Sequence, residues 1–182
     1  ILEVDNEIRL GPIAATDEDA MWNAIDGNRD YMEEFLPWVS GFSTRENHTK
    51  GFNQNRLEDD LFDRTAKYAI EYLGEFAGTA GFGKATRDNG VEIGYWLRQD
   101  LQGNGIVTRA VAALIEMAIV QMGMHRIVIR AATNNLPSQG IPKRLGFTRE
   151  GTIRGGAFLR NEYFDLEMYS MLDHEWLSRS KN

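Results

Sequence analysis

Cysteine is absent from this chain of 182 residues, which excludes disulfide bonds, thiolate metal sites and a cysteine nucleophile. Long apolar runs are also missing, and no stretch of 18 apolar residues predicts a membrane-spanning helix. The first residues lack the basic and apolar regions of a signal peptide. Together these absences favour a cytoplasmic protein that does not enter a membrane.

Basic residues are outnumbered by acidic ones, since the chain has 20 Lys and Arg residues and 27 Asp and Glu residues, for a net charge of −7. A nucleic-acid binder should carry a basic face, so this balance argues against one, whereas an acidic surface favours a cationic substrate. Only three histidines are present, His48, His125 and His174, and their scatter gives no metal-binding spacing.

What is present suits one globular domain over residues 1–182, since no repeat, low-complexity tract or linker divides the chain. Alternating or continuous apolar content predicts strands over 7–10, 67–72, 76–82, 91–98, 127–132, 148–153 and 162–172. Apolar periodicity and capping residues predict helices from Thr16, over 29–35, from Thr44 to about Asp63, over 105–122 and over 135–145. This order predicts an α+β fold with a sheet of six or seven strands and a right-handed parallel crossover in its middle.

The turn Gln102-Gly103-Asn104-Gly105-Ile106-Val107-Thr108 joins a strand to the long amphipathic helix. Two glycines in three residues let the backbone turn tightly and direct several N–H groups one way. The helix adds its unpaired N-terminal donors and the positive end of its dipole. The segment therefore suits a pyrophosphate, although taken alone it is also compatible with an ordinary strand-to-helix turn.

Four motifs follow one another along the chain: Glu92–Leu97, Gln102–Ile106, Asn135–Ser138 and Arg144–Phe147. Their order and spacing resemble the GCN5-related N-acetyltransferases (GNAT), and within them the RimJ/RimL branch, which acetylates the N-terminal amines of ribosomal proteins. The resemblance covers nearly the whole chain. It implies a GNAT-type mixed, mostly antiparallel sheet flanked by helices, acetyl coenzyme A (acetyl-CoA) as donor, no metal and direct attack by a primary amine. It also implies a homodimer.

The resemblance assigns roles to individual residues. The backbone from Gly103 to Thr108 is expected to hold the pyrophosphate, and the main chain of Trp96 to Arg98 to pair with the pantetheine arm. The N–H of Leu97 is the expected oxyanion donor. The cofactor-binding residues predicted in this way are Trp96, Leu97, Arg98, Gln102, Gly103, Asn104, Gly105, Ile106, Val107, Thr108, Asn135 and Ser138.

Ser138 is predicted to protonate the departing thiolate, and Asn135 either to bond the pantetheine or to cap the following helix. Glu92 is the preferred general base, acting through a water, although it is as readily a solvated carboxylate or the partner of an arginine. Glu150 is a weaker candidate for the base. The resemblance also places Phe35, Trp38 and Phe42 in the segment that covers the acceptor, where they either bind it or pack the first helices.

Lys143 and Arg144 are candidates for the ribose phosphate of the cofactor, and solvated helix positions are the alternative. Three positions depart from the family pattern. Val107 stands where the pyrophosphate motif ends in Gly or Ala, but the backbone donors survive this change. Pro142 replaces a tyrosine that many members use as general acid, and Ala157 replaces a glutamate proposed as base in some RimL-like enzymes. The identity of the base therefore stays open.

The predicted function is acetyl transfer to a primary amine, with the N-terminal amine of a ribosomal protein as the leading acceptor. A small amine, such as an antibiotic or a polyamine, is the alternative acceptor. A non-catalytic acyl-CoA-binding module is the rival from another class, and Pro142 and Ala157 favour it. A Rossmann-type nucleotide-binding domain is disfavoured, because no Gly-x-Gly-x-x-Gly follows an early strand.

Overall fold

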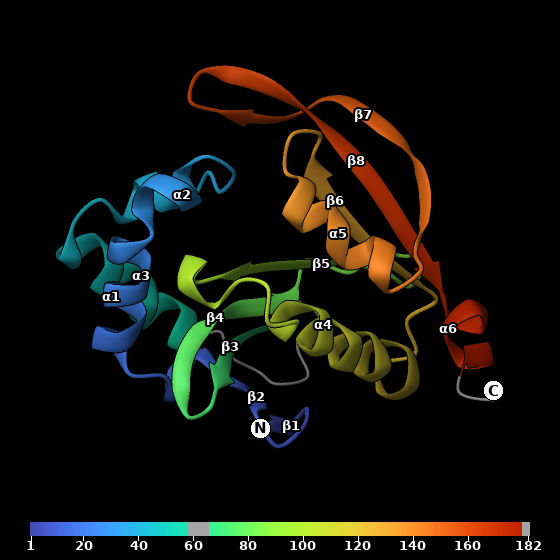
Figure 1. Cartoon of the computed structure of the whole chain (residues 1–182), viewed down its shortest axis with the longest axis horizontal. Coiled ribbons are helices and arrows are strands. Elements are labelled where there is room, and N and C mark those ends of the chain that lie inside the picture. The colour runs from blue at the N-terminus through green and yellow to red at the C-terminus, as the bar shows by residue number, and fades with distance from the viewer. Residues whose placement is uncertain (58–65, 180–182) are drawn as a thin grey trace.

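The structure is a computed structural model that describes residues 1–57 and 66–179. Its centre is one twisted mixed sheet (Figure 1) with the strand order β1-β2-β3-β4-β5-β6-β8-β7. The strands are β1 (Leu2–Glu3), β2 (Ile8–Pro12), β3 (Lys67–Tyr72), β4 (Glu75–Phe82), β5 (Gly90–Leu97), β6 (Arg126–Ala132), β7 (Thr148–Leu159) and β8 (Glu162–Leu172). Only β5 and β6 pair in parallel within the described residues, so the predicted α+β class is confirmed. The two-residue strand β1 is the one that the sequence pattern missed.

The helices begin close to where the sequence pattern predicts them. They are α1 (Glu18–Gly27), α2 (Arg29–Glu33), α3 (Arg45–Leu57), α4 (Ile106–Glu116), α5 (Leu136–Arg144) and α6 (Asp173–Arg179). The cap of α1 is Asp17, whose carboxylate accepts hydrogen bonds from the N–H groups of Asp19 and Ala20, so the predicted Thr16 cap is wrong by one residue. The predicted end of the polar helix near Asp63 lies outside the described residues. Helix α6 was not predicted.

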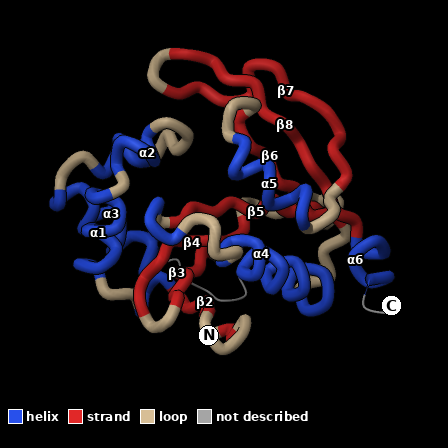
Figure 2. The backbone as a smooth tube through the Cα atoms, viewed as in Figure 1, coloured by secondary structure: helices blue, strands red, loops and turns tan. Residues whose placement is uncertain are grey.

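The helices form two groups that cover opposite faces of the sheet (Figure 2). Helices α1, α2 and α3 pack on one face through Met21, Ile25, Met32 and Phe52, where Trp96 of β5 meets them. The apolar stripe of α4 packs on the other face, together with α5 and the sheet side chains that alternate with Trp96. Alternation along β5 therefore gives it contact with both cores.

Strands β5 and β6 separate along their length. Their ladder runs only from Gly90↔Arg126 to Glu92↔Val128, so the rest of each strand is unpaired across this gap. On its other edge, β5 stays paired with β4 as far as Leu97, which lies opposite Gly78. The structure therefore opens a wedge in the middle of the sheet, directly before the glycine turn.

The register of β5 with β4 decides which backbone groups face this wedge. The N–H of Gly83 donates to the Glu92 carbonyl at 2.8 Å, and the N–H of Arg98 donates to the Ala77 carbonyl of β4 at 2.8 Å. Backbone groups of alternate residues point to the same neighbour, so the even-numbered residues of this segment face β4. The polar backbone groups of Tyr95 and Leu97 therefore face the wedge.

Candidate active site

The glycine turn has the open backbone that its sequence predicts. Gly103 and Gly105 have φ angles of 83° and 70°, in the left-handed region that favours glycine. A Cβ at either position would meet no atom within 4 Å, so the turn faces open space. Gly105 is the N-cap residue of α4 and offers no side chain to its first N–H groups. These donors and the positive end of the helix dipole are therefore available to an anion.

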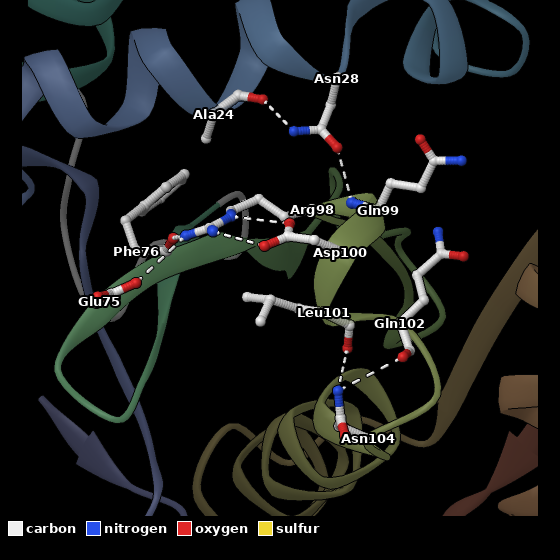
Figure 3. Close-up of polar contacts among 10 residues, drawn as sticks. All are labelled: Ala24, Asn28, Glu75, Phe76, Arg98, Gln99, Asp100, Leu101, Gln102 and Asn104. Atoms are coloured by element: carbon white, nitrogen blue, oxygen red, sulfur yellow. Dashed lines mark hydrogen bonds and ion pairs between the residues drawn. The ribbon is translucent and has the colours of Figure 1, made fainter.

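The side chain of Asn104 bends back onto the turn instead of pointing into the open space (Figure 3). Its Nδ2 donates to the carbonyl of Leu101 at 3.0 Å and lies 3.5 Å from the carbonyl of Gln102. Asn104 thus stabilises the turn by satisfying carbonyl groups that the turn leaves without backbone partners.

A cavity of about 490 Å³ extends from this turn along the end of β5 to α5. We call it the turn cavity. Its lining residues are Tyr31, Met32, Phe35, Leu36, Tyr95, Trp96, Leu97, Gln102, Gly103, Gly105, Ile106, Val107, Thr108, Asn135, Pro137, Ser138, Ile141 and Arg144. Ten of the twelve residues predicted to bind the cofactor are among them.

Arg98 and Asn104 are the two that do not line the turn cavity. The guanidinium of Arg98 pairs with Asp100 at 2.7 Å and donates to the carbonyl of Phe76 at 3.1 Å (Figure 3). Because its N–H is also bonded to β4, Arg98 has neither its side chain nor its backbone donor directed at the cavity.

Two hydroxyl groups meet within the turn cavity. The hydroxyl of Tyr95 donates to the Ser138 carbonyl at 2.9 Å, and the Ser138 hydroxyl lies 3.3 Å from the Tyr95 oxygen. Burial raises the pKa of Tyr95 well above its ordinary value, with the Ser138 hydrogen bond opposing this, so the phenol stays protonated at neutral pH. Asn135 caps α5, because its Oδ1 accepts a hydrogen bond from the Ser138 N–H at 3.1 Å.

Two long-range hydrogen bonds tie the α1–α2 segment to the glycine turn. The N–H of Gln99 donates to Oδ1 of Asn28 at 2.7 Å (Figure 3), and Nε2 of Gln102 donates to the Tyr31 hydroxyl at 2.6 Å. At the other end of the turn, the guanidinium of Arg144 donates to the Thr108 hydroxyl at 3.2 Å. These bonds fix the turn to elements far from it in sequence.

A second cavity, of about 740 Å³, adjoins the first from the α1–α3 face of the sheet. We call it the aromatic cavity, since rings of Trp38, Phe42, Phe52, Phe82, Tyr95 and Trp96 line it. The two cavities share Leu36, Tyr95 and Trp96. Of the three residues predicted to bind the acceptor, Trp38 and Phe42 line the aromatic cavity, whereas Phe35 lines the turn cavity.

Glu92 lines the aromatic cavity and is held by an arginine of β6. Both carboxylate oxygens accept from Arg130, with distances of 2.7 and 3.0 Å to its Nη2 and Nε. Glu150 lines neither cavity. Hydrogen bonds from Arg126 and Ser170 lower the pKa of Glu150 to about 2, so it is a poor proton acceptor at neutral pH.

Sequence reasoning missed several residues of the turn cavity, chief among them Tyr31, Met32, Leu36 and Tyr95. Tyr95 had a usable signal, because it lies in the Glu92–Leu97 motif and alternates onto the same side as Leu97. The others come from the α2 segment and carried no local signal.

No helix within the described residues is both long and apolar enough to cross a membrane. Over the same part of the chain, no three His, Cys, Asp or Glu side chains are grouped so that they could hold a metal ion.

Residues 7–148 match the family model described as the Acetyltransferase (GNAT) domain. The chain therefore belongs to the GNAT acetyltransferase family, as its motifs predicted, and is an acetyltransferase. It is 26% identical over 174 residues to the ribosomal-protein-serine acetyltransferase of Escherichia coli (strain K12), covering 94% of this chain and 96% of that one. It is 40% identical to YdaF of Bacillus subtilis (strain 168) over 85 residues, which span only 47% of this chain and 46% of YdaF.

Solved structures share the architecture. RimL, a ribosomal alpha-N-protein acetyltransferase in complex with coenzyme A, superimposes with a TM-score of 0.84 at 25% identity, covering 93% of this chain and 96% of RimL. The self-immunity acetyltransferase MccE, in complex with acetyl-CoA and AMP, has the same fold with a TM-score of 0.84 at 24% identity, covering 94% of this chain and 95% of MccE.

Proposed function

We propose that this acetyltransferase moves the acetyl group of acetyl-CoA directly to a primary amine, and that the acceptor is the N-terminal amine of a ribosomal protein. The observation that carries direct transfer is the contact between the two cavities at Leu36, Tyr95 and Trp96. A thioester in the turn cavity and an amine in the aromatic cavity would meet there. The relatives named as ribosomal-protein acetyltransferases support the choice of acceptor.

The turn cavity carries the backbone groups that the donor would need. The N–H groups from Gly103 to Thr108 would hold the pyrophosphate, because the turn is open and no side chain caps the helix. The backbone of Tyr95 and Leu97 would pair with the pantetheine arm, since their polar groups face the wedge. Orienting the two substrates in this way accounts for much of the acceleration, up to about 7–11 kcal/mol in well-oriented reactions.

The residues around the junction supply the proton and charge chemistry. The N–H of Leu97 would donate to the oxygen that becomes negative in the tetrahedral intermediate. The Ser138 hydroxyl, which donates to the Tyr95 oxygen in this structure, would turn to give its proton to the departing thiolate and would regain one from solvent. Glu92 would accept a proton through a water from the ammonium form of the acceptor, which leaves the neutral amine that attacks the thioester, and Arg130 would fix the direction of the Glu92 carboxylate.

Transfer rates on peptides and on small amines test this proposal. Purified enzyme and acetyl-CoA are mixed with lysine-free peptides that copy ribosomal-protein N-termini, and with a panel of aminoglycosides and polyamines. We expect values of kcat/KM for at least one peptide that exceed those for every small amine. Turnover confined to small amines would reject the acceptor, and tight binding of coenzyme A with no turnover on any amine would indicate a binding module.

A further inference from the structure

The aromatic cavity is large and mainly apolar where an acceptor would enter. Trp38 follows α2, and its ring centroid lies 5.7 Å from that of Phe42 and 6.2 Å from that of Trp96. Trp38 is 37% exposed although its ring packs against two others. The rings therefore form a wall that presents apolar surface to the open cavity.

Glycines create the space in front of this wall. Gly94 lines the cavity on β5, and a Cβ built on it would meet no atom within 4 Å. A Cβ at Gly51 of α3 would collide with the Phe42 ring, so glycine there lets the ring lie against the helix. The cavity is thus wide at Gly94 and walled with rings by Phe42 and Trp38.

Polar side chains also line the cavity, and two of them form ion pairs. Glu92 is paired with Arg130, and Lys50 with Glu46 at 2.8 Å. His48 is 2% exposed and lies among the rings of Trp22, Phe42 and Phe52. The remaining polar side chains of the lining are Asn47, Lys67 and Thr79.

Burial lowers the pKa of His48, while Glu18, 3.7 Å away, acts against this and Arg45 reinforces it. The imidazole is therefore uncharged at neutral pH. The ring surfaces of Phe42, His48 and Phe52 therefore suit apolar or aromatic groups better than charged ones.

The position of the aromatic cavity determines which part of the acceptor it would contact. An acceptor nitrogen at the junction formed by Leu36, Tyr95 and Trp96 places the group on its neighbouring carbon in the aromatic cavity. The side chain of serine or alanine would leave the rings of Trp38 and Phe42 facing water. A large apolar side chain would displace that water and cover the rings.

We propose that the aromatic cavity selects acceptors whose amine-bearing carbon carries a large apolar or aromatic group, such as an N-terminal methionine or phenylalanine. This specificity rests on the acetyl transfer proposed above and narrows its acceptor. It differs from the serine and alanine acceptors that the names of two relatives specify.

Six amines test the selection. Four are lysine-free decapeptides that differ only in their first residue, which is Ser, Ala, Met or Phe, and two are ethylamine and phenethylamine. Values of kcat/KM are measured at saturating acetyl-CoA from the release of the coenzyme thiol. We expect the Met and Phe peptides to exceed the Ser and Ala peptides by roughly 10- to 100-fold, the range for burying one large apolar side chain.

Variants test whether the rings of Trp38 and Phe42 cause the preference for large apolar first residues. In Trp38→Ala the Phe-to-Ser ratio of kcat/KM should fall to within about threefold of one, whereas Trp38→Phe should keep most of the ratio, because it keeps a ring. Gly94→Val should lower the ratio by filling the cavity from the strand. Leu177→Ala is the control, since Leu177 is a 44% exposed apolar residue on α6 and lines neither cavity. Thermal melts verify that each variant is folded, and Phe42→Ala replaces Trp38→Ala if the latter is not.

Each outcome supports or overturns either the selection for large apolar groups or the choice of a ribosomal-protein acceptor. Ser and Ala peptides that match or exceed the Met and Phe peptides would overturn the selection while leaving acetyl transfer intact. So would a Trp38→Ala variant that slows all four peptides equally. If only the two small amines react, the ribosomal acceptor is rejected. In that case a kcat/KM for phenethylamine at least about tenfold above that for ethylamine would support the selection, and a smaller ratio would overturn it. No transfer to any of the six rejects both proposals.

Discussion

Replacing Gly105 with asparagine and with aspartate tests the proposed pyrophosphate site with two side chains that match in size and differ in charge. Gly105 has a φ of 70°, a left-handed conformation that Asn and Asp tolerate better than other side chains. Because a Cβ there would meet no atom within 4 Å, neither side chain should clash with the protein. Both would project into the space beside the N–H groups at the start of α4.

The expected loss of coenzyme A affinity follows from the hydrogen bond that each variant removes and from the charge that aspartate adds. Covering one N–H that bonds a charged phosphate should cost about 1.5–3 kcal/mol, so Gly105→Asn should weaken coenzyme A binding roughly 10- to 100-fold. In Gly105→Asp, a carboxylate about 5 Å from a phosphate charge adds about 0.8–3 kcal/mol of repulsion at an effective dielectric constant of roughly 20–80. Its affinity should therefore be about 4- to 160-fold below that of the asparagine variant, and the gap should shrink in high salt.

Isothermal titration calorimetry with coenzyme A measures these affinities, and Gly123→Asn is the matched control. Gly123 has a φ of 66° and equally open space at its Cβ, but lies outside both cavities. The control should stay folded in a thermal melt and bind coenzyme A like the unchanged protein. Equal affinities for all these proteins would refute the placement of the pyrophosphate, and equal affinities for the asparagine and aspartate variants would refute the charge argument.

Three further predictions concern proton transfer and pH. Ser138→Ala should lower kcat roughly 10- to 100-fold, and Tyr95→Phe should add little once Ser138 is gone; additive losses in a double-mutant cycle would contradict their joint action. Glu92→Gln should lower kcat by roughly 10²–10⁴-fold and Arg130→Met by less, measured at saturating peptide; a kcat unchanged in Glu92→Gln would exclude it as the base. The pKa of Glu150 is about 2, below its ordinary 4.5, so its ion pair stabilises the fold fully above pH about 4.5 and not below about 2. The melting-temperature difference from Glu150→Gln should shrink over that interval, and a constant difference would contradict this.

Local patterns predicted most of the fold. The turn at Gly103 and Gly105, the apolar stripe of α4 and the closely spaced strands over 67–72 and 76–82 each depend on neighbouring residues, so their signals are contained in short segments. The cap of α1 was misplaced because Thr16 and Asp17 are both good caps, and only the backbone geometry chooses between them.

The candidate site was predicted less evenly. The family motifs located the residues of β5, the turn and α5, but they assigned the main chain of Trp96, Leu97 and Arg98 alike to the pantetheine arm. Pairing with β4 separates these three, since the Arg98 N–H is bonded to Ala77. The α2 residues of the turn cavity, Tyr31 among them, were missed because their partners lie about 70 positions away, as in the bond from Gln102, for which the sequence separation is 71.

The amino-acid sequence by itself determined the glycine turn, the helix behind it and the family, because these depend on residue types at short and fixed spacing. The tertiary structure alone decided that Tyr95 and Leu97 direct their backbone groups into the wedge, because strand register sets that direction. It also decided that the aromatic cavity and the turn cavity share Leu36, Tyr95 and Trp96, because the segment after α2 lies far from β5 in the sequence and meets it only in the folded chain.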